Sequence, residues 1–484
     1  MENNENKEND EKIIQKCIDI SCVEKDNTKN SIFSFGWKNN FANWKDNLKY
    51  NYIRFTTKFE MLPETIHLFN KIYDTHKNED KKKFNQKISK IIMVSYRSKY
   101  KPQLNIKNKT KLTSDCGWGC MIRSSQMILC RALYKIFKYK YNIKENDKLI
   151  KMIIPFIMEN NLKLTKEHEY AEMDNYINKL KSFGKKDIIE IDPPFSIHKI
   201  CILGEKFGRT CGEWFSDFEL PKIYDIINTT FDIFPYLSII HFNSIIELKT
   251  ILERCFKEDT TNNDNNNNNN NNTVENNIND NNTNEIITNK DNNIPIENNP
   301  NVINSKDNNI NTINDENKIK IEDKTYVFEK MGLIFITVRL GVSKVAADYF
   351  PSLKKKFDCK ECIGFIGGKK YSNSASYFFG YYNNHLLYLD PHYNNISINK
   401  LDEESIKTYT HKTIYQFKFG SLKGGLTLGF LFRNIKEFND LLTCFRENKK
   451  EEFPCFDYSE KMSNKKDDEY LNKVMKEMSN DDDF

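Results

Sequence analysis

The sequence predicts an α+β fold in which a helical half precedes a strand-rich half. Before residue 256 the apolar residues recur mainly at helical spacing. After residue 331 they form short β-branched and aromatic runs, which are separated by Gly, Asn or Pro. An asparagine-rich tract with an unbroken run from Asn265 to Asn272 lies between the two regions. Helices and strands that are segregated along the chain are typical of an α+β domain.

The composition excludes several classes of protein. The chain has 484 residues, with 73 basic and 68 acidic side chains, so it lacks the basic excess of a nucleic-acid-binding protein. Its twelve cysteines show no framework spacing, and Met1 to Asp10 contain no apolar stretch of a signal peptide. No run approaches the ~20 apolar residues that a membrane-spanning helix needs. We therefore expect a cytoplasmic protein with free thiols.

Changes in composition also predict the domain boundaries. Residues 1–30 are polar and residues 448–484 are charged, so we expect both ends to be disordered or flexible. Residues 257–324 are expected to form a disordered insertion, because an Asn-rich tract buries too little apolar surface to offset the entropy of ordering it. A self-associating Asn-rich module is the alternative. Residues 31–256 and 325–447 are then expected to form one domain.

Helical periodicity identifies the elements of the first half and one closing helix. Helices are expected over Met61–Tyr73, Lys82–Met93, Cys120 to about Lys140, two segments within 148–182, Leu220–Asn228, Ser244–Phe256 and Lys436–Phe445. The helix that begins at Cys120 is apolar almost all round near its start, which predicts that it is buried. Ser196 follows two prolines and is well placed to cap the next element.

The second half carries the strand signals. Strands are expected over Gly332–Leu340, Cys362–Ile366, Ser376–Tyr382, His385–Asp390, Thr413–Phe419 and Leu426–Phe432. These segments predict a sheet that packs against the helical half.

The stretch TSDCGWGC, from Thr113 to Cys120, carries the first chemical signal. It combines a glycine-flanked turn with a cysteine at the first position of the buried helix. A helix N-terminus stabilises a thiolate, and Gly117 and Gly119 allow a tight turn and close approach of a substrate. A structural cysteine at a buried helix start explains this stretch equally well. Cys116 could compete as a nucleophile, but Cys120 is the residue at the helix start.

A base for such a thiol would have to come from only eight histidines. His392 is the best candidate, because Asp390 lies two residues earlier at the end of a predicted strand and would face the same side. A simple turn at the strand end is the alternative, since Asp-Pro is a common turn signal. The other histidines have no acidic or cysteine partner at a telling spacing. Cys359-x-x-Cys362 is a lone pair of thiols, for which two unrelated cysteines are more plausible than a zinc or redox site.

The stretch TSDCGWGCMIRSSQM strongly resembles the active-site stretch of the autophagins, the papain-like cysteine proteases of autophagy. Further motifs look like family motifs in family order: FSIH at 195–198, GEWF at 212–215, VRLG at 338–341, IGGK at 366–369, YFFG at 377–380, YLDPH at 388–392 and LGF at 428–430. They cover most of Tyr96 to about Leu442, apart from the insertion and weaker stretches around 141–190. The resemblance implies a papain-like fold, with the nucleophile on the helical half and Asp and His on a mostly antiparallel sheet.

The resemblance also implies an activity. Autophagins are endopeptidases that trim the ubiquitin-like autophagy modifier after a C-terminal glycine and later release it from phosphatidylethanolamine. The partners implied are both forms of this modifier, with transient proximity to a membrane, no nucleic acid, and no metal or organic cofactor.

The family's functional residues can be carried over to this sequence by position. Cys120 matches the nucleophile, His392 the general base and acid, and Asp390 the residue that orients the histidine. Tyr96 matches a tyrosine that forms the oxyanion hole with the Cys120 backbone N–H. Trp214 matches a tryptophan that covers the substrate groove, and Gly367-Gly368 match a gating loop.

The chain departs from the family pattern after these glycines. The loop from Gly367 to Ser374 is longer than the usual form and lacks its proline. This difference bears on whether Trp214 gates the groove as in the family and on which substrate is chosen. Three alternatives stay open at this point: a protease for ubiquitin-like modifiers in general, a non-catalytic adapter that binds the modifier, and an Asn-rich scaffold. An adapter would not need Cys120, Asp390 and His392 together.

Overall fold

A computed structural model describes residues 10–18, 22–24, 59, 65–101, 104–105, 111–163, 171–185, 188–260, 310–312, 317–321, 324–370, 372–410 and 413–461. The chain divides into two compact units, one formed by Met1–Cys255 with Glu329–Phe484 and the other by Phe256–Phe328. Each unit is described by itself.

The larger unit is built on a nine-stranded sheet. Its strands are β2 (Thr65–Leu68), β3 (Lys71–Asp74), β9 (Leu237–Asn243), β15 (Met331–Arg339), β16 (Cys362–Lys369), β17 (Ser372–Tyr382), β18 (His385–Leu389), β20 (Tyr415–Lys418) and β21 (Leu422–Phe432). The order is β20-β18-β17-β16-β21-β15-β9, and β2 pairs with both β17 and β3. Only the β15–β9 pair is parallel among these described strands. The prediction of a mainly antiparallel sheet in an α+β fold is confirmed.

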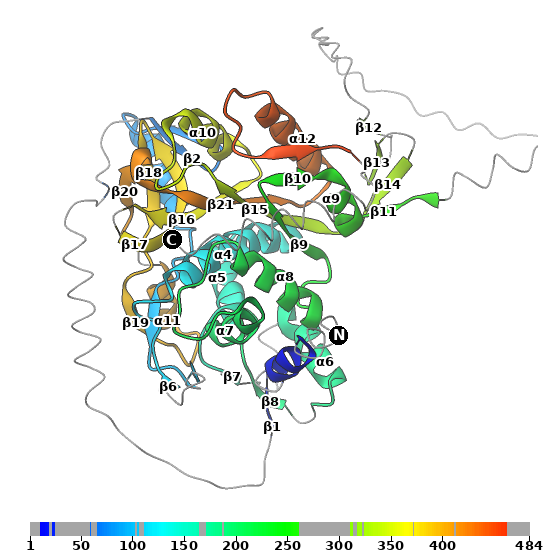
Figure 1. The fold of residues 1–484 in the computed structure, drawn as a ribbon. Helices are drawn as coiled ribbons and strands as arrows, with labels where there is room; N and C mark the ends of the chain where they lie inside the picture. The colour runs from blue at the N-terminus through cyan, green and yellow to red at the C-terminus, as the bar shows by residue number, and fades with distance from the viewer. Residues whose placement is uncertain are drawn as a thin grey trace, which may run out of the picture. The chain divides into compact units, whose positions relative to one another are not determined.

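Helices cover the sheet of the larger unit. They span residues 10–18, α3 (Asn78–Ile88), α4 (Cys120–Tyr141), α5 (Asn146–Ile153), α6 (Asp174–Ser182), α7 (Ile197–Gly204), α8 (Glu219–Phe231), α9 (Leu248–Cys255), α10 (Phe350–Asp358), α11 (Glu403–Thr410) and α12 (Ile435–Lys449). Helix α4 lies between the sheet and helices α5, α7 and α8 (Figure 1). Every residue from Ile122 to Tyr134 is buried, as its apolar sequence predicts.

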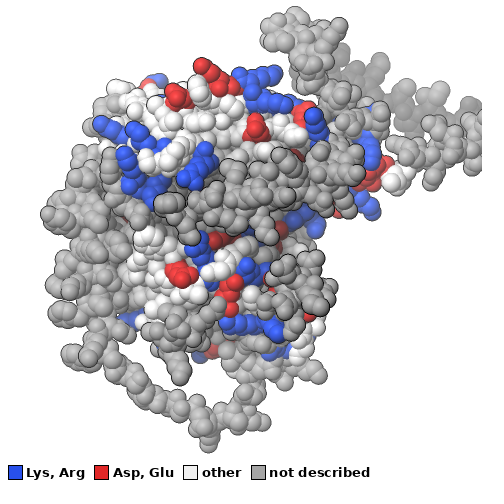
Figure 2. All heavy atoms as spheres, in the orientation of Figure 1, with Lys and Arg blue, Asp and Glu red and all other residues white. Residues whose placement is uncertain are grey.

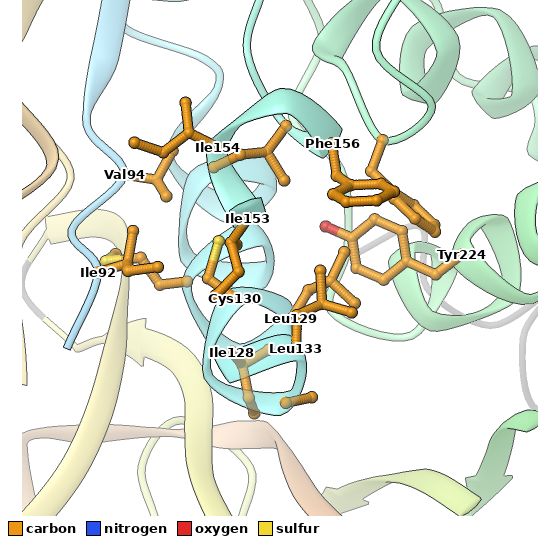
Figure 3. Packing of buried hydrophobic residues seen from close by; sticks show 14 of the residues in the cluster. Ile92, Val94, Ile128, Leu129, Cys130, Leu133, Ile153, Ile154, Phe156 and Tyr224 are labelled. Atoms are coloured by element: carbon orange, nitrogen blue, oxygen red, sulfur yellow. The ribbon is translucent and has the colours of Figure 1, made fainter. Parts of the chain in front are cut away.

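Apolar side chains hold α4 in place on both sides. Ile128, Leu129 and Leu133 belong to the same buried cluster as Phe156 and Tyr224 from the helical half (Figure 3). On the sheet side α4 approaches β21 so closely that a Cβ added to Gly429 would lie 2.5 Å from Ile128 Cδ1. The first residue of α4 is therefore fixed relative to the sheet.

One three-stranded sheet and three strand pairs are described outside the nine-stranded sheet of this unit. They are β1 (Cys22–Glu24), β7 (Leu162–Lys163) and β8 (Ile188–Ile191) in one small sheet, β10 (Ile245–Glu247) with β22 (Asp457–Ser459), β5 (Leu104–Asn105) with β6 (Lys111–Leu112), and β4 (Tyr96–Ser98) with β19 (Asn394–Ile396). The last pair is parallel and sets Tyr96 opposite Asn394. It thereby joins the segment before the cysteine turn to the segment after His392.

The smaller unit is a four-stranded antiparallel sheet. Its order is β11 (Phe256–Glu258), β14 (Lys324–Phe328), β13 (Lys318–Ile321) and β12 (Ile310–Thr312). The expectation that 257–324 lacks structure is thus wrong at both ends of the segment: Lys257 and Glu258 belong to β11, and Ile319 and Ile321 of β13 are buried. Residues 261–309, which include the Asn run, lie outside the described residues.

Both predicted disordered ends also contain ordered segments. The helix over residues 10–18 buries Cys17 and Ile18 in the main core. After α12, strand β22 pairs with β10, and Cys455, Phe456 and Tyr458 are buried. In each case a few apolar residues within a polar sequence are enough to attach the segment.

Two of the predicted helical segments are partly strands. The described part of Met61–Tyr73 forms the β2–β3 hairpin, whose turn has positive φ at Phe69 (48°) and Asn70 (62°). A two-residue turn of this kind suits a hairpin, and asparagine tolerates the left-handed conformation. Residues 245–247, in the predicted helix Ser244–Phe256, form β10 before α9 begins at Leu248.

The sequence patterns did not indicate strand β9 or helices α10 and α11. Ser196 caps α7 as expected, because its side chain accepts a hydrogen bond from the Lys199 N–H.

On the face drawn in Figure 2, basic and acidic side chains are interspersed, in line with the nearly balanced charge.

Candidate active site

A tight turn delivers Cys120 to the start of α4. The carbonyl oxygen of Asp115 accepts the N–H groups of Trp118 (3.2 Å) and Gly119 (2.9 Å), and Gly117 has a φ of 93°. A Cβ at Gly119 would lie 2.5 Å from Asp115 Oδ2, so a larger residue there would displace Asp115 or the helix start. The first N–H groups of a helix lack intrahelical acceptors, and they favour negative charge at Cys120.

A buried ion-pair network holds this turn. Arg123 binds Asp115 through Nε and Glu159 through Nη1 (2.7 Å), and all three side chains are fully buried. Burial alone would lower the pKa of Arg123, but the two carboxylates raise it well above its usual value. The Arg97 N–H donates to Asp115 Oδ1 at 2.7 Å. Asp115 therefore connects the Tyr96 segment to the cysteine turn, a role that the sequence did not indicate.

Asp390 and His392 follow directly after β18. Asp390 Oδ1 pairs with His392 Nδ1 and also accepts the His392 backbone N–H at 3.1 Å. The Pro391 carbonyl accepts the Tyr96 N–H at 2.8 Å. These contacts fix the imidazole ring and leave Nε2 as the nitrogen available to a second partner.

Cys120 and His392 are both buried and shift each other's pKa through hydrogen bonding and charge. Burial raises the pKa of the Cys120 thiol, but the hydrogen bond and charge of His392, assisted by Ala375 N–H and the Tyr96 hydroxyl, lower it below its usual value. Burial lowers the pKa of His392, whereas Asp390 and then Cys120 raise it to about 9. This arrangement favours a thiolate–imidazolium pair.

Lys369 is a further charged group at this site that sequence reasoning missed. Its Nζ lies 3.3 Å from Asp390 Oδ2 and 3.1 Å from the Tyr388 hydroxyl. Burial raises the pKa of Asp390, but Lys369 and then His392 hold it well below its usual range. The Asp390 carboxylate therefore stays ionised at neutral pH.

Tyr96 lies beside both members of the pair. It is 1% exposed, and its ring packs edge-on against the His392 ring with 5.2 Å between centroids. Its hydroxyl hydrogen-bonds the Cys120 sulfur and thereby helps to lower the pKa of the thiol.

A cavity of about 350 Å³ opens onto Cys120. Trp214 lines it, is 51% exposed, and donates from Nε1 to the Gly117 carbonyl at 2.9 Å. Asp217 also lines it, and burial raises the pKa of this carboxyl to about 6. Aromatic side chains, including Trp118 and Phe215, thus form part of the wall of the cavity that contains Cys120.

Gly367 and Gly368 lie in strand β16 and not in a loop, whereas their role in gating the groove stays a prediction. They pair with Ser376 and Ala375 of β17. Glycine suits these positions because a Cβ at Gly368 would lie 2.8 Å from Lys423 Cδ and one at Gly367 would lie 3.2 Å from Leu426 Cβ. Gly368 lines the Cys120 cavity, whereas Gly367 does not.

The described part of the chain contains no group of three or more His, Cys, Asp or Glu side chains that could hold a metal ion. None of its helices is both long and apolar enough to cross a membrane. Its cysteines are free, including Cys359 and Cys362.

Comparison with known proteins finds similarity to cysteine peptidases, both in a family model and in individual relatives. The family described as "Peptidase C54 catalytic domain" matches residues 81–444. Cysteine protease ATG4B of Gallus gallus is 23% identical over 400 residues, which cover 81% of this chain and 83% of that protein. Cysteine protease ATG4C of Homo sapiens is 21% identical over 476 residues, covering 87% of this chain and 89% of that protein.

Proposed function

This chain belongs to the peptidase C54 family of autophagy cysteine proteases, and we propose that it cleaves the ubiquitin-like autophagy modifier after a C-terminal glycine and releases the same modifier from phosphatidylethanolamine. One observation carries the proposal: the buried contact of the Cys120 thiol with His392, whose other ring nitrogen pairs with Asp390. A helix-start thiol paired with an oriented imidazole is suited to acyl transfer.

In this proposal Cys120 is the nucleophile. Its thiolate attacks the carbonyl carbon of the modifier's terminal glycine and forms a tetrahedral oxyanion. The Cys120 backbone N–H and the Tyr96 hydroxyl donate hydrogen bonds to that oxyanion. His392 then protonates the leaving nitrogen, and the C–N bond breaks to leave a thioester on Cys120.

Hydrolysis completes the cycle. His392, now neutral, removes a proton from water, which attacks the thioester carbonyl and releases the modifier with a free glycine carboxylate. The same chemistry serves both substrates, because the leaving nitrogen is a peptide nitrogen in the precursor and the ethanolamine nitrogen in the lipid-linked form. Asp390 keeps Nδ1 protonated and the ring oriented throughout.

Trp214 is proposed to act as the cover of the groove. Its exposed indole and the Gly368 backbone bound the cavity at Cys120. In this proposal the space between them admits only a residue without a side chain, which favours glycine at the cleaved bond. We also propose that 31–256 and 325–447 form one protease domain interrupted by the intervening segment; the compact unit that spans Cys255 and Glu329 supports this division.

The test compares two substrates that differ in the modifier. The purified full-length protein is incubated with the autophagy modifier carrying a C-terminal extension, and with ubiquitin carrying the same extension. Intact mass is expected to show one product that ends at the modifier's glycine, with the ubiquitin fusion uncut. A second arm follows release of the modifier from phosphatidylethanolamine vesicles. Binding without cleavage would contradict the proposal, and cleavage of both fusions would contradict its substrate choice.

A further inference from the structure

A second cavity, of about 440 Å³, is lined mainly by lysines. It lies among strand β3, helix α3 and the last turn of α4, and its charged lining residues are Lys71, Asp80, Lys83, Lys87, Lys90 and Lys138. Lys138 lies eighteen positions after Cys120 along α4, a rise of roughly 27 Å. The cavity is therefore separate from the active site.

The positive charge of this cavity is poorly compensated. Asp80 is the single carboxylate in its lining; its Oδ1 lies 3.7 Å from Lys83 Nζ, and its Oδ2 accepts the Asp74 N–H. Lys71, Lys87, Lys90 and Lys138 form no ion pair with any carboxylate in the described part of the chain. Four lysine side chains thus face one space without a counterion from these residues.

The buried guanidinium of Arg131 adds a further positive charge close to Lys87. Arg131 is 6% exposed, its Cζ lies 4.0 Å from the centre of the Phe69 ring, and Lys87 Nζ lies 5.9 Å from the same centre. Arg131 Nε has no hydrogen-bond partner among the described residues. Burial, followed by the charges of Arg131, Lys71, Lys135 and Lys90, lowers the pKa of Lys87 to about 7.

Helix dipoles explain only part of this arrangement. Lys87 and Lys138 occupy the last turns of α3 and α4, where cations interact favourably with the C-terminal partial charge. Lys71 is in a strand, Lys90 follows α3, and Arg131 lies in the middle of α4. Gathering these cations around one cavity costs free energy unless an anion is bound there.

We propose that this cavity binds a ligand with two or more clustered phosphate groups, of the kind carried by an inositol polyphosphate or by the headgroup of a phosphoinositide. Ammonium groups are suited to phosphate, because each lysine supplies a full charge and three donors. Several ammonium groups from three separate elements match several phosphates better than a single one. The proposal does not depend on the substrate of the protease.

Binding is tested on the full-length protein with two probes. Isothermal titration at low salt measures inositol hexakisphosphate, and co-sedimentation measures phosphatidylcholine vesicles with or without phosphatidylinositol bisphosphate. Binding of the soluble probe alone identifies a free phosphate compound as the source. Preference for the phosphoinositide vesicles identifies a lipid headgroup. Binding of neither probe overturns the proposal.

Paired lysine substitutions test whether the ligand binds in this cavity. Lys87→Gln with Lys90→Gln is expected to weaken binding by roughly thirtyfold, because each charge near the ligand typically contributes about 1 kcal/mol and two are removed. The control pair Lys81→Gln with Lys82→Gln changes two exposed lysines of α3 that do not line the cavity, and should leave affinity within about twofold. Lys71→Gln with Lys138→Gln, both exposed, repeats the test where folding is not at risk. Equal losses in the control and cavity pairs would overturn the assignment.

A proton linkage provides an independent readout. With a pKa of about 7, Lys87 is mostly deprotonated at pH 8, and a bound anion restores its proton. The heat of binding should therefore vary with the ionisation enthalpy of the buffer, and this dependence should be lost in Lys87→Gln. Binding with no proton uptake in the wild type would show that the ligand does not contact Lys87.

Discussion

Lys369 Nζ contacts Asp390 Oδ2 at 3.3 Å, on the carboxylate oxygen opposite to the one that His392 uses. Four charges therefore alternate in sign through the site, from the Lys369 ammonium to the Asp390 carboxylate, the His392 imidazolium and the Cys120 thiolate. Each ion has an oppositely charged neighbour, which allows all of them to be buried. Lys369 is a positioning residue, because it acts on the histidine through Asp390.

This charge arrangement predicts a bell-shaped pH dependence of kcat/KM. Activity falls at low pH as the Cys120 thiolate is protonated, and at high pH as His392 loses its proton near its pKa of about 9. Lys369→Met removes a neighbouring cation, so the pKa of His392 should rise and the alkaline limb should move to higher pH. The adjacent Lys370→Met serves as the control. An unmoved alkaline limb in Lys369→Met would contradict the predicted coupling.

Tyr96→Phe tests the proposed oxyanion donor. The change removes only the hydroxyl that hydrogen-bonds the Cys120 sulfur. We expect kcat to fall by on the order of 10²–10³ with little change in KM, because the lost bond acts in the transition state. Steady-state kinetics on the extended modifier measure this, and an unchanged thermal midpoint would show that the fold is intact. A rise in KM at constant kcat would assign Tyr96 to substrate binding instead.

Arg123→Met tests the network behind the cysteine turn. It leaves Asp115 and Glu159 buried without their cation, so we expect a loss of unfolding free energy of roughly 3–5 kcal/mol. Arg446→Met breaks the exposed pair with Glu460 and should cost only about 0–1 kcal/mol. Urea unfolding compares the two variants. Similar losses in both would mean that burial does not distinguish these ion pairs.

Gly119→Ala tests the geometry of the turn. The added methyl would meet Asp115 Oδ2 at 2.5 Å, so Asp115 or the helix start must shift. We expect destabilisation of about 1–3 kcal/mol together with a marked loss of activity. Gly420→Ala adds the same methyl with its nearest neighbour at 3.9 Å and should be nearly neutral. Full activity in Gly119→Ala would show that the position of Cys120 tolerates such a shift.

The sequence predicted the elements whose local pattern fits one structure only. Helix α4 has a long apolar surface, and β15 and β21 are long β-branched and aromatic runs, so each pattern leaves little choice. The β2–β3 hairpin was predicted as a helix, because its few apolar residues fit either period and the Phe69-Asn70 turn decides between them. The ordered ends of the chain depend on a few apolar contacts with distant elements.

The residues of the candidate site also fall into two groups, those that the local sequence indicates and those that only the fold reveals. Cys120, Asp390 and His392 could be proposed because their residue types and local spacing have chemical meaning. Lys369 and the Asp115–Arg123 pair could not, because their roles depend on partners that folding brings together: Lys369 meets a carboxylate 21 residues later, and Arg123 meets Glu159 across a helix boundary 36 residues away. Strand placement of Gly367 and Gly368 likewise follows from pairing with β17 and β21.

The most direct test of the account is the cleavage of the extended modifier by the wild type, Cys120→Ala and Cys116→Ala, followed by intact mass. Cys116 lies four residues before Cys120 in the same turn and packs near it, so it is the matched control thiol. The account predicts that cleavage is abolished in Cys120→Ala and retained in Cys116→Ala. Cleavage that survives in Cys120→Ala, or is lost only in Cys116→Ala, would contradict the assignment of Cys120 as the nucleophile.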